Sequence, residues 1–355
     1  MSVIKVLIVD DSALIRQTFR TLLETDPEIQ VIGTASDPFI AVQKIQRERP
    51  DVITLDIEMP RMDGLTFLKK IMVQAPMPVV VISNQTLKGA DVALKALEIG
   101  AVDVMTKPGL SNETEIEESR IRLIDKVRSA FFSKRNTTSR TDTMPATVAE
   151  SAKTFKRSPI QQSAFSGQSL IAIGASTGGT EAIRSFLEVL PAKMPPILIV
   201  QHMPEKFTSS FAKRLNDLCA LEVKEAEDLE LVQPNTVYIA PGNHHMAIRN
   251  SGGKTAIKIF QGELVNRHRP SVNVLFHSVA EVKGKHAIGI IMTGMGDDGA
   301  TGMLAMYEKG SHTIAQDEAT SVVYGMPNKA VQAGGVCSVL PLQQIPVEVC
   351  ERIKA

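Results

Sequence analysis

The chain has 355 residues, which is long for one hydrophobic core, so we expect two domains. Lysine plus arginine and aspartate plus glutamate both number 39, and the resulting zero net charge gives no global field that favours nucleic acid or a membrane surface. Tryptophan is absent and there are only 3 tyrosines, which argues against stacking on bases or sugars.

Three scattered cysteines, Cys219, Cys337 and Cys350, form no Cys-x-x-Cys pair or Cys/His cluster. A disulfide framework and a zinc site are therefore not expected. The N-terminus lacks a signal-peptide layout, and no apolar run reaches transmembrane length. We expect a cytoplasmic protein that does not insert into a membrane.

The first third of the chain alternates strand and helix patterns. Apolar, β-branched runs predict strands at residues 5–9, 52–55, 78–82 and 102–105, and an apolar face over 14–23 predicts a helix between the first two. A closing helix is predicted over 113–132, with acidic residues early and basic residues late, as the helix dipole favours. This alternation predicts an α/β domain with a parallel sheet and helices on both faces.

Acidic residues follow two of these strands: Asp10 and Asp11 after the first, and Asp56 after residue 55. Like charges at one sheet edge repel unless a cation joins them or a pKa rises, and an all-oxygen set favours Mg²⁺. Ser83 and Lys107 follow neighbouring strands and add a hydroxyl and an ammonium. Together these groups suit a carboxylate that accepts a phosphoryl group. The alternative is that these residues only cap helices or lie at solvated strand ends.

The apolar pattern stops over residues 133–168, which are polar apart from a weak helical pattern at 146–156. We place a first domain at 1–125, a linker at 126–168 and a second domain at 169–355. Strands are then predicted at the following residues: 170–174, 197–201, 237–240, 287–292 and 313–316. Apolar faces over 183–190 and 207–218 predict helices between them, so the second domain is also a doubly wound α/β fold.

The run from Gly174 to Gly179, Gly-Ala-Ser-Thr-Gly-Gly, follows the first of these strands and opens a helix. Ser176 can therefore be a nucleophile in a strand–turn–helix elbow, beside backbone N–H groups that stabilise an oxyanion. It can equally belong to a phosphate-binding loop. The spacing matches neither a P-loop nor a Gly-x-Gly-x-x-Gly fingerprint.

A serine nucleophile needs a base and an acid that orients the base. His202 follows the next strand, and Asp297 and Asp298 follow a later one, so three strand ends deliver Ser, His and Asp to one sheet edge. His244 and His245 follow another strand and are rival bases.

The loop Asn266-Arg267-His268-Arg269-Pro270 is basic. It could dock an acidic substrate, or it could be an ordinary solvated turn; the sequence leaves both open.

Residues 1 to about 125 resemble a response-regulator receiver domain through four motifs: Val-Asp-Asp-Ser at 9–12, Leu-Asp-Ile-Glu-Met-Pro at 55–60, Asp-Gly at 63–64 and Lys-Pro at 107–108. The resemblance implies a flavodoxin-like fold with a five-stranded parallel sheet, and phosphorylation of Asp56 by a histidine kinase.

The same resemblance implies roles for the residues around Asp56. Mg²⁺ would be held by Asp11 and Asp56, with Asp10 acting through water and the Glu58 carbonyl completing the set. Ser83 takes the switch position, and Lys107 contacts the phosphoryl group. One departure is that Val104 stands in the region where many receivers carry a tyrosine or phenylalanine.

Over its whole length the chain resembles the chemotaxis protein-glutamate methylesterases. Four motifs carry the resemblance, at residues 174–180, 201–204, 266–272 and 293–299. It implies a catalytic triad of Ser176, His202 and Asp298, with oxyanion donors near Thr177 and Met295, no cofactor in the esterase site, and no role for Asp297.

This resemblance also implies the reaction and its control. The enzyme would be a monomer that demethylates glutamyl γ-methyl esters of methyl-accepting chemoreceptors, with deamidation of receptor glutamines as a related activity. The unphosphorylated receiver would cover the site, and phosphorylation would relieve this block.

Two other functions remain as alternatives. In the first, the second domain binds a nucleotide at 174–179 and has no catalytic role. In the second, the chain is a transcription regulator with a DNA-binding output domain. The neutral charge and the strand-rich second half, without a helix-turn-helix pattern, argue against DNA binding.

Overall fold

The computed structural model describes residues 3–59, 63–84, 86–109, 112–141 and 169–353. For residues 134–141 it describes the backbone only. The chain divides into two compact units, Met1–Arg140 and Thr141–Ala355. None of the helices within the described ranges combines the length and the apolar character needed to cross a membrane.

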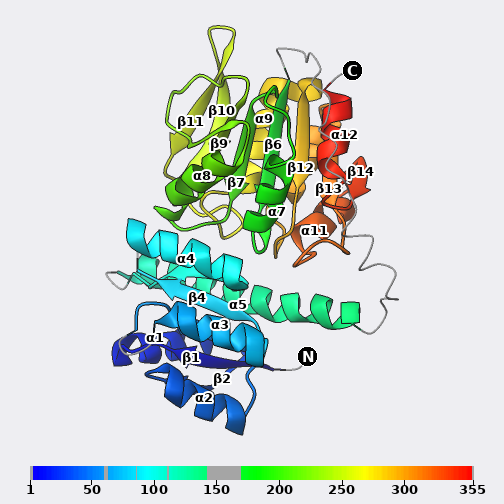
Figure 1. Ribbon diagram of the computed structural model, residues 1–355. Helices are drawn as coiled ribbons and strands as arrows, with labels where there is room; N and C mark the ends of the chain where they lie inside the picture. Colours follow the sequence, from blue (N-terminus) through cyan, green and yellow to red (C-terminus); the bar gives the residue numbers. More distant parts are fainter. Residues whose placement is uncertain (1–2, 60–62, 85, 110–111, 142–168, 354–355) are drawn as a thin grey trace. The chain divides into compact units, whose positions relative to one another are not determined.

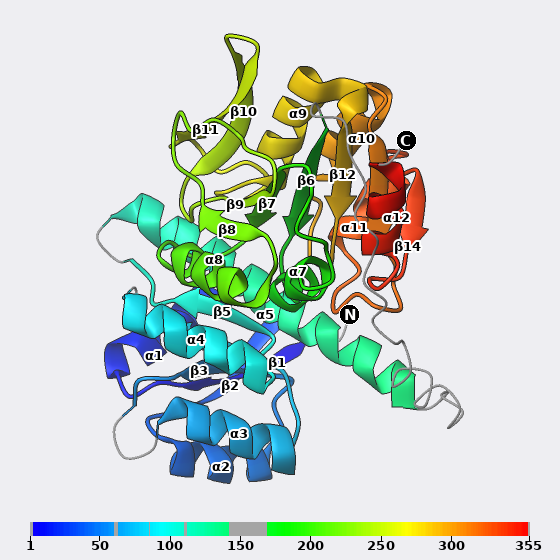
Figure 2. The same cartoon turned by 45° about the horizontal axis from the view of Figure 1, so that its top comes forward.

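The first unit is a parallel sheet of five strands in the order β2-β1-β3-β4-β5, which confirms the predicted fold (Figure 1). Its strands are β1 (Ile4–Val9), β2 (Ile29–Ala35), β3 (Val52–Asp56), β4 (Val79–Ser83) and β5 (Asp103–Thr106). Its helices are α1 (Ala13–Leu23), α2 (Pro38–Arg47), α3 (Gly64–Gln74), α4 (Leu87–Ile99) and α5 (Glu113–Thr141). Helices α3 and α4 lie side by side (Figure 2).

Helix α5 extends beyond the residues predicted for it. It continues to Thr141, so residues 126–141, which we placed in the linker, are helical. The core accounts for the helix as far as Ala130, since Leu123, Val127 and Ala130 keep the helical spacing and are completely buried with side chains of β1 and α1. The weak helix suggested at 146–156 lies outside the described residues.

The second unit is built on a seven-stranded sheet in the order β14-β13-β12-β6-β7-β9-β8, in which every pairing is parallel. Its strands are β6 (Leu170–Ala175), β7 (Ile197–Gln201), β8 (Glu222–Glu225), β9 (Thr236–Ile239), β12 (Ala287–Ile291), β13 (His312–Gln316) and β14 (Ser338–Leu340). The predicted doubly wound fold is thus confirmed.

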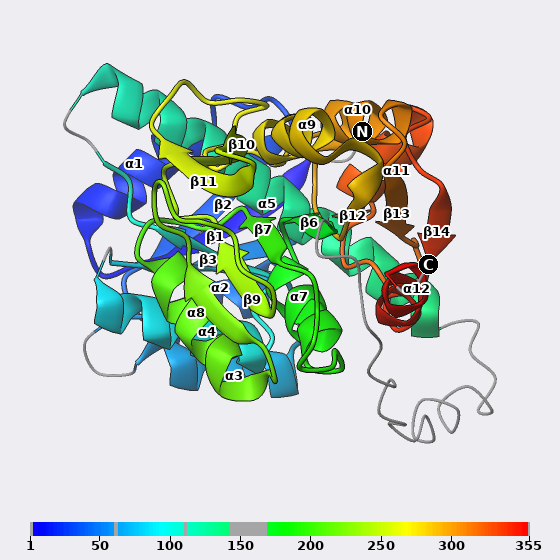
Figure 3. The same cartoon turned by 90° about the horizontal axis from the view of Figure 1, so that it is seen from above.

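Helices cover both faces of this sheet. They are α7 (Gly179–Leu187), α8 (Phe207–Leu218), α9 (Val272–Lys283), the short 3₁₀ helix η1 (Gly284–His286), α10 (Ala300–Glu308), α11 (Met326–Gln332) and α12 (Ile345–Arg352). Figure 3 shows α9 and α10 on one face and α7 and α8 on the other. The α9 side chains Val272, Leu275 and Phe276 are completely buried in the core on their face.

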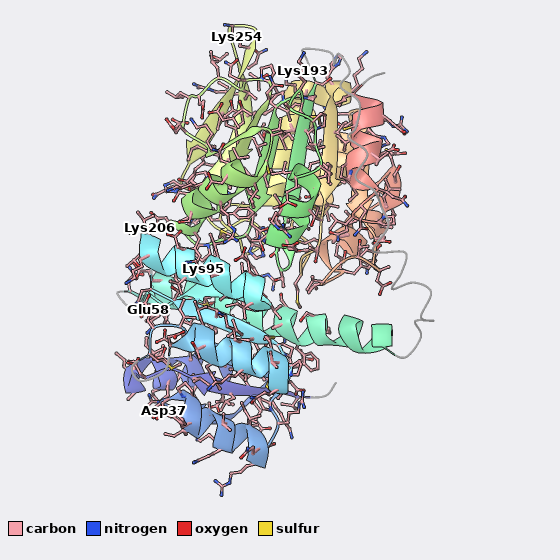
Figure 4. The ribbon with its side chains drawn as sticks, viewed as in Figure 1. Asp37, Glu58, Lys95, Lys193, Lys206 and Lys254 are labelled. Carbon is pink, nitrogen blue, oxygen red and sulfur yellow. The ribbon has the colours of Figure 1, made fainter. Side chains whose placement is uncertain are left out.

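An antiparallel hairpin of β10 (His245–Ser251) and β11 (Lys254–Phe260) stands apart from the main sheet. Lys254, at its tip, is labelled in Figure 4. Gly252 and Gly253 form the turn with positive φ angles of 58° and 79°, which glycine adopts at little cost. The hairpin packs against α9 and so helps to fix the position of that helix.

Candidate active and phosphorylation sites

Ser176 lies directly after β6, at the entry to α7. Its N–H donates to the Thr293 carbonyl at 3.0 Å, and its carbonyl accepts from Gly179 N at 2.7 Å and from Gln201 Nε2 at 2.9 Å. The peptide bond between Ser176 and Thr177 is trans, so the N–H of Thr177 points in the direction opposite to the fixed Ser176 carbonyl. Gly178, with φ of 79°, makes the turn into the helix.

His202 lies beside Ser176. Ala175 and Gln201 are register partners in the parallel pair β6–β7, and His202 N donates to the Ala175 carbonyl at 3.1 Å. Neighbouring strands run about 4.8 Å apart, so the residues that follow these partners meet at the carboxyl edge of the sheet. The structure thus brings together the predicted serine and histidine.

Asp298 is completely buried and accepts four hydrogen bonds. Oδ2 accepts from His202 Nε2 at 2.8 Å and from Val272 N at 2.7 Å, and Oδ1 accepts from Ser271 Oγ at 2.7 Å and from Asn273 N at 3.1 Å. The carboxylate therefore caps the N-terminus of α9, where free N–H groups and the helix dipole favour negative charge.

This bond fixes the protonation pattern of His202. A carboxylate can only accept, so the proton lies on Nε2 and Nδ1 carries the lone pair. Nδ1 is buried and has no hydrogen-bond partner among the described residues. An imidazole nitrogen that is free to accept, at the strand end next to that of Ser176, is suited to act as a general base.

The predicted oxyanion residue Met295 follows β12 in a loop that passes close to Ser176. A Cβ on Gly294 would lie 2.7 Å from Ser176 Cβ, so only glycine allows this approach. Thr293 ties the two loops together, since its Oγ1 donates to the Thr177 carbonyl at 2.9 Å. Its N–H donates to Gln316 Oε1 at the end of β13 at 2.8 Å.

The rival candidates occupy other positions. His245 is buried, donates from Nε2 to the Glu263 carbonyl at 2.9 Å and accepts at Nδ1 from Ser271 N at 3.2 Å, so backbone groups use both ring nitrogens. His244 Nδ1 contacts its own loop at the Gly242 carbonyl. Asp297 is exposed, and its side chain accepts a hydrogen bond of 3.2 Å from the Asn266 amide.

The basic loop lies against the site. The ring of His268 stacks on that of His202, with centroids 3.7 Å apart and planes at 14°. Arg269 bonds within the protein, from Nε to Asn243 Oδ1 at 3.0 Å and from Nη1 to the Gly262 carbonyl at 2.6 Å. Sequence analysis did not identify this stacking.

Four residues that could not be assigned from the sequence hold Asp298 and Ser176 in place. Ser271, Asn273, Gln201 and Thr293 fill these roles. Ser271 stands just before an apolar helical pattern, which is a recognisable N-cap position. Gln201 and Thr293 begin two of the motifs that carry the family resemblance, but those motifs do not indicate these contacts, and Asn273 carries no such signal.

In the first unit, Asp10, Asp11 and Asp56 each offer an oxygen within 4.8 Å of the others, as predicted. Lys107 Nζ lies 2.7 Å from Asp56 Oδ2 and 3.6 Å from Asp10 Oδ2. Asp10 Oδ2 is buried without a hydrogen-bond partner in the described part of the chain. The cluster therefore has a buried oxygen able to bind a cation.

Burial, and then repulsion from Asp56, raise the pKa of Asp10 from 3.8 to about 6. Burial alone would lower the pKa of Lys107, but its hydrogen bond to Asp56 and its attraction to the carboxylates outweigh this and raise it. The ammonium thus stays charged beside the two acids.

Ser83 and Glu58 flank the cluster. Ser83 is completely buried, and its carbonyl accepts from Lys107 N at 2.9 Å, so both lie at neighbouring strand ends. The Glu58 N–H donates to Asp56 Oδ1 at 2.9 Å, while its exposed side chain, labelled in Figure 4, accepts from Asn84 Nδ2 at 2.6 Å. Val104 is buried in β5.

Comparison with known proteins finds matches for both units. The family model "CheB methylesterase" matches residues 171–349, and "Response regulator receiver domain" matches residues 6–118. A protein-glutamate methylesterase/protein-glutamine glutaminase of Geobacter metallireducens is 51% identical over 98% of this chain and 99% of its own length. A protein of the same description from Escherichia coli K12 is 50% identical over 100% and 98%.

Among solved structures, the catalytic domain of Thermotoga maritima CheB methylesterase matches with a TM-score of 0.52 and 40% identity, covering 53% of this chain and 100% of that domain. Family models and full-length relatives thus agree across both units. The chain belongs to the CheB methylesterase family, with a response-regulator receiver domain preceding the methylesterase domain.

Proposed function

We propose that the protein hydrolyses glutamyl γ-methyl esters on methyl-accepting chemoreceptors and releases methanol, under control of phosphorylation at Asp56. The relatives described above are named protein-glutamate methylesterase/protein-glutamine glutaminase, which supports the hydrolysis of glutamyl methyl esters. The observation that supports it most strongly is the bond between His202 and Asp298, which leaves Nδ1 of His202 as an acceptor at the strand end next to that of Ser176.

In the proposed acylation step, His202 Nδ1 takes the proton of Ser176 Oγ as the oxygen attacks the ester carbonyl. Asp298 holds the ring and stabilises the imidazolium through Nε2–H. The backbone N–H groups near Thr177 and Met295 stabilise the oxyanion. The imidazolium then protonates the leaving methoxide, so methanol departs and an acyl-enzyme remains.

Water completes the reaction. His202 accepts a proton from the water that attacks the acyl carbonyl, Ser176 leaves with a proton, and glutamate is released. Deamidation of a receptor glutamine follows the same route with ammonia as the leaving group. We propose it as a second activity of this site, and it needs no cofactor there.

In the receiver, Asp56 would accept a phosphoryl group from a histidine kinase. The buried and unbonded Oδ2 of Asp10 and the three convergent carboxylates fit Mg²⁺. Asp10, Asp11, Asp56 and the Glu58 carbonyl would hold the ion, with Asp10 acting through water. When bound, Mg²⁺ neutralises phosphoryl oxygens.

Lys107 would pair with the phosphoryl group, and Ser83 would serve as the switch hydroxyl. We place the receiver at residues 1–125 plus the continuation of α5, and the methylesterase domain at 169–355. The proposed kinase and the methylated segments of the proposed chemoreceptors would meet the protein in the cytoplasm, so we propose a cytoplasmic location. We also propose that the protein is a monomer.

The first test is the variant Ser176→Ala, assayed for methanol release from methylated chemoreceptors. We expect release to be abolished while phosphorylation of the receiver by a small phosphodonor is unchanged. Methanol release near the wild-type rate would refute the role of Ser176. An activated ester should also give an acyl-enzyme burst with the wild type, which a nucleotide-binding module would not.

The second test concerns control. Asp56→Asn removes the proposed acceptor, so we expect low basal methanol release that a phosphodonor cannot raise. Full activation of this variant by acetyl phosphate would show that control does not pass through Asp56.

A further inference from the structure

His268 contacts the proposed base but has no part in the mechanism above. Its ring covers one face of the His202 ring, with centroids 3.7 Å apart and planes only 14° from parallel. Asp298, by contrast, approaches His202 in the ring plane, at Nε2. The base is therefore contacted at an edge by a carboxylate and on a face by a second imidazole.

The loop that carries His268 is held at several points. The backbones of Val265 and His268 exchange hydrogen bonds of 3.1 Å and 3.0 Å. Farther out, the buried His245 side chain bonds to Glu263 on one side of this turn and to Ser271 on the other. The Arg269 side chain adds two more bonds. The stacked ring is thus presented by a fixed segment.

Stacking on the base has a direct chemical consequence. His202 becomes a cation each time it accepts the serine proton. The face of a neutral aromatic ring attracts a cation by about 0.5–2 kcal/mol, a factor of roughly 2 to 30 in rate where the charge exists only in the transition state. A second positive charge on that face would instead repel the imidazolium.

We propose that His268 is a positioning residue for the proposed ester hydrolysis: its aromatic ring holds the plane of His202 and stabilises the imidazolium as it forms. This inference rests on the proposed function. It differs from the docking role considered for the basic loop, in which His268 would supply positive charge to an acidic substrate.

Two substitutions separate these roles. His268→Phe keeps a flat aromatic face and removes all charge, whereas His268→Lys keeps a positive charge and removes the ring. If the ring stabilises His202, the Phe variant should retain kcat within about 2-fold, and the Lys variant should lose at least as much as His268→Ala. If His268 instead docks an acidic substrate through its charge, the Lys variant should be more active than the Phe variant, and KM should change.

The assay is methanol release from methylated chemoreceptors by the full-length, phosphodonor-activated protein, with thermal unfolding recorded for each variant. For His268→Ala we expect kcat to fall between about 2-fold and 30-fold with KM unchanged. His277→Ala, which removes an exposed histidine of α9, is the matched control and should equal the wild type. If the Ala variant is unstable, the comparison of kcat between the Phe and Lys variants still tests the proposal.

Retention of activity by Lys with loss by Phe, or equal activity in all three variants, would overturn the inference. Ser176→Ala is measured alongside to separate the two proposals. If Ser176→Ala remains active, the proposed function fails. If it is inactive and the His268 variants do not follow the expected order, only the role of His268 fails.

Discussion

Asp298→Asn replaces the acid of the proposed triad with its amide, and the hydrogen bonds around it set the expected size of the effect. The carboxylate serves four donors, two at each oxygen, and each oxygen serves one N–H of α9, from Val272 at Oδ2 and from Asn273 at Oδ1. An amide offers one oxygen only. In either orientation its NH₂ group therefore faces one of these backbone donors and leaves it unsatisfied.

An unsatisfied buried donor costs about 1–3 kcal/mol. For a domain of this size, 1 kcal/mol shifts the unfolding temperature by about 2–4 °C, so the methylesterase domain should unfold about 2–12 °C lower. Activity should fall more steeply, because the charge opposite the imidazolium is lost and the proton on Nε2 is no longer fixed. We expect kcat to fall on the order of 10²- to 10⁴-fold.

The matched control is Asp297→Asn, one residue away. Asp297 is exposed and accepts an amide hydrogen bond of 3.2 Å from Asn266, so its variant should unfold within about 1 °C of the wild type and keep full activity. Calorimetry and methanol release measure both variants. Equal unfolding temperatures for Asp298→Asn and the wild type, or a larger effect at Asp297, would refute the reasoning.

Three further predictions concern other parts of the chain. Burial raises the pKa of Asp10 to about 6, so the folded protein holds this proton more tightly than the unfolded chain, and stability is lost as pH rises from about 4 through 6. Without divalent ions, Asp10→Asn should therefore be more stable than the wild type by about 3 kcal/mol at pH 8, with no gain near pH 4 in urea titrations; a gain independent of pH would contradict this. Gly179→Ala places a Cβ 2.1 Å from Gln201 Oε1 and should cost about 1–3 kcal/mol with loss of activity, whereas unchanged melting would show that the loop adapts. Burial raises the pKa of the Cys219 thiol to about 11, so at pH 8 iodoacetamide should modify the exposed Cys337 well before Cys219, as followed by mass spectrometry; faster labelling of Cys219 would contradict its burial.

The strand ends could be predicted from sequence because parallel strands are short, apolar and bounded by glycine or polar residues. Strands β1, β3, β6 and β7 agree with the predicted ranges within about one residue. The edge strand β2 was not located, since Gln30, Gly33 and Thr34 interrupt its apolar pattern. The β10–β11 hairpin was missed as well, because charged residues such as Arg249 and Lys258 occupy its exposed positions.

Some residues of the candidate site could likewise be placed from the sequence, and others could not. Topology alone placed Ser176, His202 and the two aspartates at one edge, but only the resemblance distinguished Asp298 from Asp297. In the structure, burial and four hydrogen bonds distinguish them. His268 could not be placed from sequence, because its position depends on how a long connection folds against α9.

The order of strands in the second sheet has a consequence for synthesis of the protein. Strand β6 comes first in the unit but lies between β7 and β12, and β12 starts at Ala287. The proposed acid is at residue 298, after β12 and well beyond Ser176 in the sequence. A nascent chain therefore exposes the proposed nucleophile before it contains the proposed acid. Under the proposed mechanism, esterase activity begins only after β12 and residue 298 have left the ribosome and joined the sheet.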